Sequence, residues 1–466
     1  MDLKINKKNI HLLFLFVSFL IMVILSFKTN FLSGTSLWRD EAHAWTIAKY
    51  CSFGEIYKLM HVEGHMLLWY VVLKPFTVFN SQYYLILKFL NWAFMLGACI
   101  ILIKYSKINP YFKCLIILSP IFIYFSTFAR CYSMGIFFLF WACAIYKQRL
   151  EHPYKYFILL ALAANTSILA LFCALGMGII FLAELYNDKL KNNRDMRIPV
   201  LITIYAFLIG IFLCFQFFPV QIPNYQGSFN PNNNIVTNFF MHKGIGLNFK
   251  SLIVFIYAYA ALLFFTKPKV GFIYVFSMLS AIALFVFVYY PYRWHLYFLF
   301  FYLIISYWIY LEENPSITIK KIVNISMLLL LLLNLLLGSV SKTGDSAFAY
   351  YVKKYVKETT TGKIFAGCSP AILPSIIAEL NKDGLFVYDL NDRNLSLYEG
   401  LETYYNDSKK EKSIHNFYNK VLPKGSSILI MNRDSIKKMG FERGVIKNTR
   451  FVHRSWGYYI FIVEKQ

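Results

Sequence analysis

The sequence predicts an α-helical polytopic membrane protein with a small α/β domain outside the membrane at its C-terminal end. Hydrophobic residues make up 58% of the 466 positions and charged residues only 15%, whereas soluble domains carry about 25% charge. Apolar runs such as residues 10–27 and 322–337 match the roughly 20 residues that span a bilayer. These observations exclude a cytosolic enzyme.

The apolar runs predict about eleven transmembrane helices. The predicted spans are residues 10–27, 85–103, 114–129, 131–146, 155–168, 169–185, 198–218, 251–266, 270–289, 295–311 and 320–339. The first run is too long for a signal peptide and lacks a small-residue cleavage site, so we expect it to remain as the first helix.

The basic residues predict the orientation, because Lys and Arg accumulate in cytoplasmic loops. Three lysines precede residue 10, which places the N-terminus in the cytoplasm and residues 28–84 in a first external loop. The apolar run at 66–79 is interrupted by Lys74-Pro75. As a span it would move three later basic loops outside, so we expect an interfacial or re-entrant segment. An odd number of spans then leaves the C-terminus outside.

The net charge of +23 is explained mainly by these loops and in part by sites for anionic membrane lipids. Nucleic acid is not an expected partner. The eight cysteines have no metal-binding spacing and predict no disulfide framework.

Two regions follow from the change of composition near residue 341. Residues 1–340 form the transmembrane module. Residues 341–466 alternate polar residues with short apolar runs and predict an external α/β domain. Strands are expected at 363–366, 385–390, 427–431 and 458–463, and helices at 371–380 and 414–421.

The first external loop carries the acidic residues that best fit a catalytic site. It reads Leu-Trp-Arg-Asp-Glu-Ala at 37–42, and Glu63-Gly64-His65 follows about twenty residues later. A carboxylate can take a proton from an attacking hydroxyl or amine. A second carboxylate and a histidine can hold a divalent ion or orient the base. An isolated Asp-Glu pair is more often a solvated loop feature.

Two basic motifs are expected at the same side of the membrane. The segment at 128–133 reads Phe-Ala-Arg-Cys-Tyr-Ser and places Arg130 and Tyr132 at a turn between two spans. The alternative is an arginine that reaches the interface. The segment at 289–295 adds Arg293 and His295 to a run of aromatic residues, which alone would be read as an interfacial aromatic belt.

These motifs together resemble the GT-C superfamily of membrane glycosyltransferases. The nearest branches are the protein O-mannosyltransferases and the ArnT-like aminoarabinose transferases of lipid A. Members show an Asp-Glu pair after Leu-Trp, then a segment like Gly-His-Pro-Pro-Leu-Tyr-Tyr, and often Ala-Arg-x-Tyr-Ser. This chain has Gly-His-Met-Leu-Leu-Trp-Tyr at 64–70, without the two prolines, and Ala-Arg-Cys-Tyr-Ser at 129–133.

The resemblance implies an inverting transferase that takes its sugar from a polyprenyl-phosphate carrier and passes it to an extracytoplasmic lipid, glycan or protein. Asp40 would be the catalytic base, with Glu41 orienting Arg130 or a backbone turn. Arg130 and Arg293 would stabilise the phosphate leaving group. The other implied substrate-binding residues are Glu63, His65, Tyr132 and His295, of which Glu63 and His65 are also candidate ligands for a divalent metal ion.

Two other functions stay open at this point. An O-antigen polymerase or ligase also acts on lipid-linked glycans, but it would use basic residues in large external loops. A secondary transporter would show internal repeats and mid-membrane charges, and neither is found. The sequence has no Walker loop, dinucleotide-binding glycine motif or HExxH motif.

Overall fold

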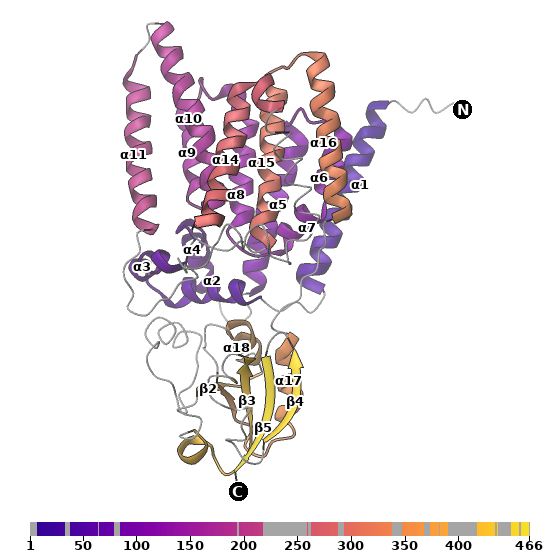
Figure 1. Ribbon diagram of the computed structural model, residues 1–466, viewed down its shortest axis with the longest axis vertical. Helices are drawn as coiled ribbons and strands as arrows, with labels where there is room; N and C mark the ends of the chain where they lie inside the picture. Colours follow the sequence, from indigo (N-terminus) through magenta and orange to yellow (C-terminus); the bar gives the residue numbers. More distant parts are fainter. Residues whose placement is uncertain are drawn as a thin grey trace, which may run out of the picture.

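The computed structural model consists of a helical bundle with a small β-sheet domain at one of its ends (Figure 1). Helix α1 (Lys7–Phe27) begins at the end of the bundle that lies away from the sheet. The described residues are 7–32, 38–63, 65–78, 84–192, 195–217, 259, 262–287, 293–337, 347–367, 373–381, 383–389, 417–433, 436, 449–455 and 458–465.

Most of the bundle consists of helices that run along its length. After α1 these are α5 (Tyr84–Tyr105), α6 (Pro110–Ile117), α7 (Pro120–Thr127), α8 (Tyr132–Ala144), α9 (Pro153–Ala164), α10 (Ile168–Lys191), α11 (Arg197–Phe217), α14 (Pro268–Phe287), α15 (Arg293–Glu312) and α16 (Ile317–Leu337). Within the bundle α5 packs along α8, α8 along α9, and α10 between α9 and α14.

The apolar helices make this an integral membrane protein, but the predicted count of about eleven spans is not confirmed. Among the described residues, six helices are long and apolar enough to cross a membrane, and a bent pair raises the number to seven. Helices α8 and α9 have 13 and 12 residues, fewer than the roughly 17 of a straight span. The predicted span at 251–266 falls mostly outside the described residues.

The predicted span at 114–129 belongs to that bent pair, α6 and α7, whose axes differ by 51°. The break has a local cause. The Ser119 hydroxyl accepts a hydrogen bond from the Phe122 backbone N–H at 3.2 Å, and Pro120 is the first residue of α7. Serine as a helix cap followed by proline starts a new helix and cannot continue an old one.

Three short helices of the first loop lie across the end of the bundle that faces the sheet (Figure 1). They are α2 (Arg39–Tyr50), α3 (Phe53–Glu63) and α4 (Leu68–Leu73). The described part of the run at 66–79 forms the six residues of α4 and a 3₁₀ turn over Lys74–Val78, which together are too short to cross a bilayer.

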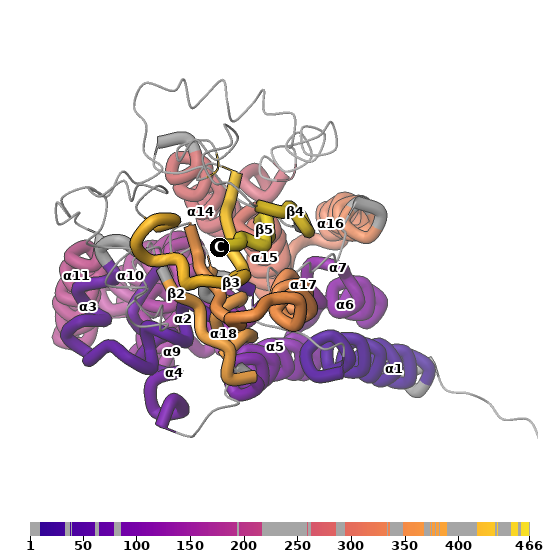
Figure 2. The backbone as a smooth tube through the Cα atoms, turned by 90° about the horizontal axis from the view of Figure 1, so that it is seen from below, coloured from indigo at the N-terminus to yellow at the C-terminus, as the bar shows by residue number. Residues whose placement is uncertain are grey.

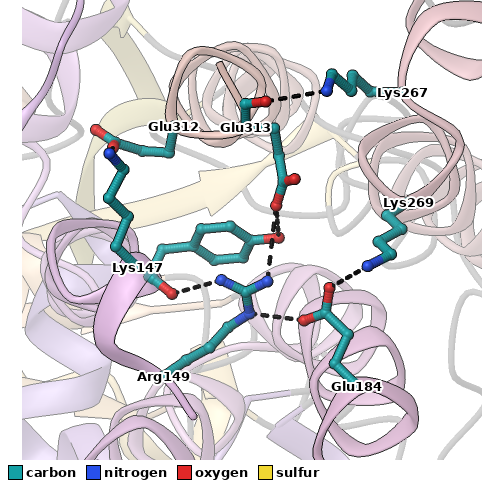
Figure 3. Close-up of polar contacts among 8 residues, drawn as sticks. Lys147, Arg149, Glu184, Lys267, Lys269, Glu312 and Glu313 are labelled. Atoms are coloured by element: carbon teal, nitrogen blue, oxygen red, sulfur yellow. Dashed lines mark hydrogen bonds and ion pairs between the residues drawn. The ribbon is translucent and has the colours of Figure 1, made fainter. Parts of the chain in front are cut away.

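A network of ion pairs and hydrogen bonds links several helix ends (Figure 3). It lies at the end of the bundle away from the sheet (Figure 1). The Arg149 Nε lies 2.7 Å from a Glu184 oxygen, and its Nη2 lies 3.6 Å from Glu313. Lys269 reaches the other Glu184 oxygen at 2.6 Å, and Lys267 donates to the Glu313 carbonyl at 2.9 Å. The network therefore joins the connection after α8 to α10, α14 and α15.

The C-terminal domain contains a mixed five-stranded sheet in the order β2-β1-β3-β5-β4. The first three strands in this order are parallel, and β5 runs antiparallel to β3 and β4. The strands are β1 (Ile364–Ala366), β2 (Val387–Asp389), β3 (Gly425–Asn432), β4 (Thr449–Ser455) and β5 (Tyr458–Lys465). The four predicted strands are confirmed as β1, β2, β3 and β5. Strand β4 was not predicted.

Each face of the sheet has its own core, because side chains alternate along a strand. On β3, Ile428 and Ile430 pack with helices α17 (Ala347–Val356) and α18 (Pro374–Asn381), while Leu429 and Met431 pack with Phe417 on the other face. The predicted helix at 371–380 is confirmed as α18. The one predicted at 414–421 has a single described turn at Phe417–Val421, and α17 was not predicted.

The domain meets the bundle through α18, which packs against α2. Both views place α18 next to α2, seen from the side in Figure 1 and from the sheet end in Figure 2. The helix that carries Asp40 and Glu41 thus lies between the bundle and the C-terminal domain.

Candidate active site

The first turn of α2 places its two acidic residues at the helix N-terminus. Asp40 and Glu41 are the second and third residues of α2, where the positive end of the helix dipole favours negative charge. The Glu41 Oε2 accepts a hydrogen bond from the Trp38 backbone N–H at 2.9 Å. A glutamate at this position satisfies one of the backbone donors at a helix start. The Asp-Glu sequence therefore helps to form the helix that presents it.

Glu41 also joins α2 to the turn between α7 and α8. Its Oε1 accepts a hydrogen bond from the Ala129 backbone N–H at 2.7 Å. The Glu41 side chain is fully buried. Both carboxylate oxygens are thus used for backbone donors, one on each segment, and Glu41 fixes the position of the α7–α8 turn relative to α2.

Arg130 lies in that turn and extends toward Asp40. Its Nη1 is 3.1 Å from the Asp40 Oδ2. The Arg130 side chain is almost fully buried, whereas 23% of the Asp40 side chain is exposed. A buried arginine in a membrane protein needs a partner or water, and Asp40 is that partner. Unlike Arg130, the Asp40 side chain therefore keeps some exposed surface.

His65 contacts the same guanidinium group. The Arg130 Nη2 meets the His65 Nε2, and the His65 Nδ1 lies 3.7 Å from the Cys131 Sγ. A guanidinium group can only donate hydrogen bonds, so Nε2 accepts and the ring proton lies on Nδ1. Both ring nitrogens therefore face protein groups, and a metal site at His65 and Glu63 stays a prediction, since the Glu63 side chain lies outside the described residues. No cluster of three potential metal-binding side chains occurs among the described residues.

Aromatic rings border the Asp40–Arg130 pair. The Tyr132 ring packs against both His65 and His295, with ring centroids 6.0 and 6.1 Å apart. The Trp38 and Trp294 rings meet edge to face at 4.6 Å. These contacts bring the start of α15 to the start of α2.

Two asparagines hold the end of α7 and were not singled out in the sequence. The Asn30 side chain donates to the Ser126 carbonyl at 2.9 Å, and the Asn91 side chain donates to the Phe125 carbonyl at 3.0 Å. Both asparagines are buried. They satisfy carbonyl groups that the last turn of a helix leaves without helical partners. Asn91 lies in an apolar run, where an amide residue usually indicates helix packing, and Asn30 follows Lys28-Thr29 at the end of the first apolar run, where a polar residue gives no signal.

The structure therefore brings most of the sequence-predicted residues together. Asp40, Arg130 and His65 are joined by direct side-chain contacts. Glu41 holds the backbone next to Arg130, and Tyr132 and His295 lie beside them. The side chains of Glu63 and Arg293 lie outside the described residues. The backbone of Glu63 ends α3 and that of Arg293 begins α15.

Fold and site define a helical integral membrane protein with an acid–base cluster at the end of the bundle that faces its sheet domain. No family model matches the chain, and no curated protein matches it. Among solved structures, the chain is similar to the crystal structure of ArnT from Cupriavidus metallidurans in the apo state. That similarity covers 97% of both chains, with 10% sequence identity and a TM-score of 0.43.

Proposed function

We propose that this protein is an inverting glycosyltransferase that uses a polyprenyl-phosphate-linked sugar as donor. The observation that carries the proposal is the pairing of Asp40, partly exposed, with Arg130, buried beside it at 3.1 Å. A proton acceptor and a cation side by side are the two groups that a transfer from a lipid phosphate needs.

The proposed reaction is a single displacement at the anomeric carbon. The acceptor hydroxyl or amine forms the new bond to that carbon and gives its proton to Asp40. The bond between the carbon and the phosphate oxygen breaks on the opposite face, which inverts the configuration. The electron pair stays on the phosphate, and Arg130 and Arg293 stabilise the polyprenyl phosphate that leaves. Glu41 has a positioning role, because it holds the turn that carries Arg130. No step is assigned to a metal ion.

The charges support an extracytoplasmic site. Lys107 and Lys147 share Glu312 at 3.4 and 3.5 Å, in the region of the Arg149 network at the far end of the bundle. Lysine and arginine accumulate on the cytoplasmic side of membrane proteins. We therefore place that end in the cytoplasm, and Asp40 and the C-terminal domain outside.

A transfer assay tests the proposal. Purified protein in lipid nanodiscs is mixed with a polyprenyl-phosphate sugar and an acceptor, and release of free polyprenyl phosphate is measured. Asp40→Asn keeps the size of the side chain but removes its function as a proton acceptor. Turnover should fall at least about 100-fold, the lower range for a general base, while donor affinity changes only a few-fold.

An acceptor whose nucleophile is already deprotonated provides the control. It should restore near-normal turnover to Asp40→Asn, since no proton then has to be removed. If turnover stays lost with that acceptor, Asp40 is a structural residue or a ligand and not the base. A wild-type protein that releases no polyprenyl phosphate from any such donor would contradict the transferase, and joining of lipid-linked glycans to one another would indicate a polymerase or ligase.

A further inference from the structure

Lys88 is a fully buried lysine in the membrane bundle, and it has no role in the reaction proposed above. Its side chain has no exposed surface. It belongs to the inner face of α5, together with Asn91, Met95, Ala98 and Leu102, which are also fully buried. These spacings of three and four residues place all five on one side of a helix. Most of that face is apolar, and its polar residues gather at the start of α5.

Hydrogen bonds place this polar end of α5 at the level of the candidate active site. Asn91 donates to the Phe125 carbonyl and accepts from the Ser133 hydroxyl, which also contacts the Arg130 carbonyl at 3.3 Å. Lys88 precedes Asn91 by three residues, about 4.5 Å further toward the start of α5. Helical side chains lean toward the helix N-terminus, and α5 also packs against α2.

Two other lysines, buried Lys113 and half-buried Lys74, show the ordinary structural use of such a cation in this protein. The Lys113 Nζ donates to the carbonyls of Ile103 and Ser106 at 2.7 and 2.9 Å, at the C-terminal end of α5. The Lys74 Nζ donates to the carbonyls of Ala48 and Cys51 at the C-terminal end of α2. Both cations satisfy carbonyls at the negative end of a helix dipole.

Lys88 differs from them in its position along the helix. It is the fifth residue of α5, near the positive end of the dipole, where a cation is disfavoured and an anion is favoured. An ionisable residue inside a membrane bundle is by default a candidate for a functional role, because its burial is costly. A lysine at this place adds to the positive potential of Arg130 and of the helix start.

We propose that Lys88 binds the phosphate of the lipid donor, as a second cation next to Arg130. This inference rests on the proposed function, which supplies a lipid phosphate as ligand. The Lys88 ammonium would donate hydrogen bonds to phosphate oxygens from the α5 side, while Arg130 acts from the α7–α8 turn. Lysine commonly binds phosphate as a point charge. Lys88 would remain in contact with the phosphate after the sugar has left.

A comparison of two lipids tests Lys88 separately from the chemistry. The probes are a polyprenyl phosphate and the polyprenol of the same chain length, and their affinities are measured for each variant in nanodiscs. Wild type should prefer the phosphate. Lys88→Met should lose about 10- to 100-fold of that preference, the effect of one hydrogen bond to a charged group, with polyprenol affinity unchanged. Lys88→Arg should keep most of the preference.

The matched control is Lys113→Met, which removes another buried lysine of the bundle and should leave the preference unchanged. The ratio of the two affinities also corrects for partial unfolding, which lowers both. If Lys88→Met does not insert, Lys88→Gln is measured in the same way. If the wild-type protein shows no preference for the polyprenyl phosphate, both the proposed role of Lys88 and the proposed function are wrong. If the Lys88 variants keep the wild-type preference, the proposed role of Lys88 is wrong and the proposed function is unaffected.

Discussion

The substitution Glu41→Gln should destabilise the fold far more than its small chemical change suggests. Each Glu41 oxygen accepts a backbone hydrogen bond, from Ala129 at 2.7 Å and from Trp38 at 2.9 Å, in a fully buried side chain. Glutamine has one accepting oxygen, so its amide nitrogen must face one of these two N–H donors. A hydrogen bond to a charged group contributes about 1.5–3 kcal/mol, and the remaining bond becomes a weaker neutral one.

The free energy of unfolding should therefore fall by about 2–4 kcal/mol. Equilibrium unfolding in mixed micelles measures it, and the transfer assay should show a parallel loss of turnover because Arg130 moves with the turn. The matched control is Glu55→Gln. Glu55 accepts from the Ser52 backbone N–H at 2.6 Å at the start of α3, but it is exposed, so water can replace the lost acceptor. Equal losses in the two variants would refute the assignment of Glu41 as the link between α2 and the turn.

Two further substitutions test the packing of the bundle. Arg149→Met should destabilise the protein by about 3 kcal/mol, the lower end of the range for a buried pair, because it leaves Glu184 and half-buried Glu313 without this cation. Arg197→Met, at an exposed ion pair of 4.0 Å, should change little. Thermal unfolding in detergent compares them, and equal melting temperatures would contradict the network. Gly271→Ala should destabilise by about 1–3 kcal/mol, because the added methyl group would overlap the backbone of Phe264. Gly178→Ala, where the nearest atom would be 3.9 Å away, should be neutral or stabilising.

Much of the bundle could be predicted because bilayer thickness and hydropathy leave few alternatives. The described helices start and end near the predicted span limits. Arg130 was marked by its charge between two apolar runs, and Asp40 by its pairing with Glu41 in the first loop. The number of crossings was harder to predict. Helices α8 and α9 are shorter than the apolar runs from which their spans were predicted. The α6–α7 bend depends on one cap, Ser119-Pro120, within an otherwise continuous apolar run.

The groups that support the site were not predictable from local pattern. Asn30 and Asn91 donate hydrogen bonds to carbonyls that lie 96 and 34 residues further along the chain. These groups meet only when the bundle has folded. Lys88 was hidden in an apolar run, where one lysine near a predicted helix end usually reaches the interface. Strand β4 was missed because its sequence, Thr-Arg-Phe-Val-His-Arg-Ser, is polar enough for a loop and becomes a strand through pairing with β5.

The contacts of Asp40 and Glu41 explain why aspartate precedes glutamate in this pair. Neighbouring residues on a helix point about 100° apart, so Asp40 faces the Arg130 side chain while Glu41 faces the Ala129 backbone. In the reversed order the shorter acid would meet the backbone N–H and fall short by about one carbon–carbon bond, roughly 1.5 Å. Searches for further chains of this kind should therefore require aspartate first and glutamate second, and should count reversed pairs as unrelated.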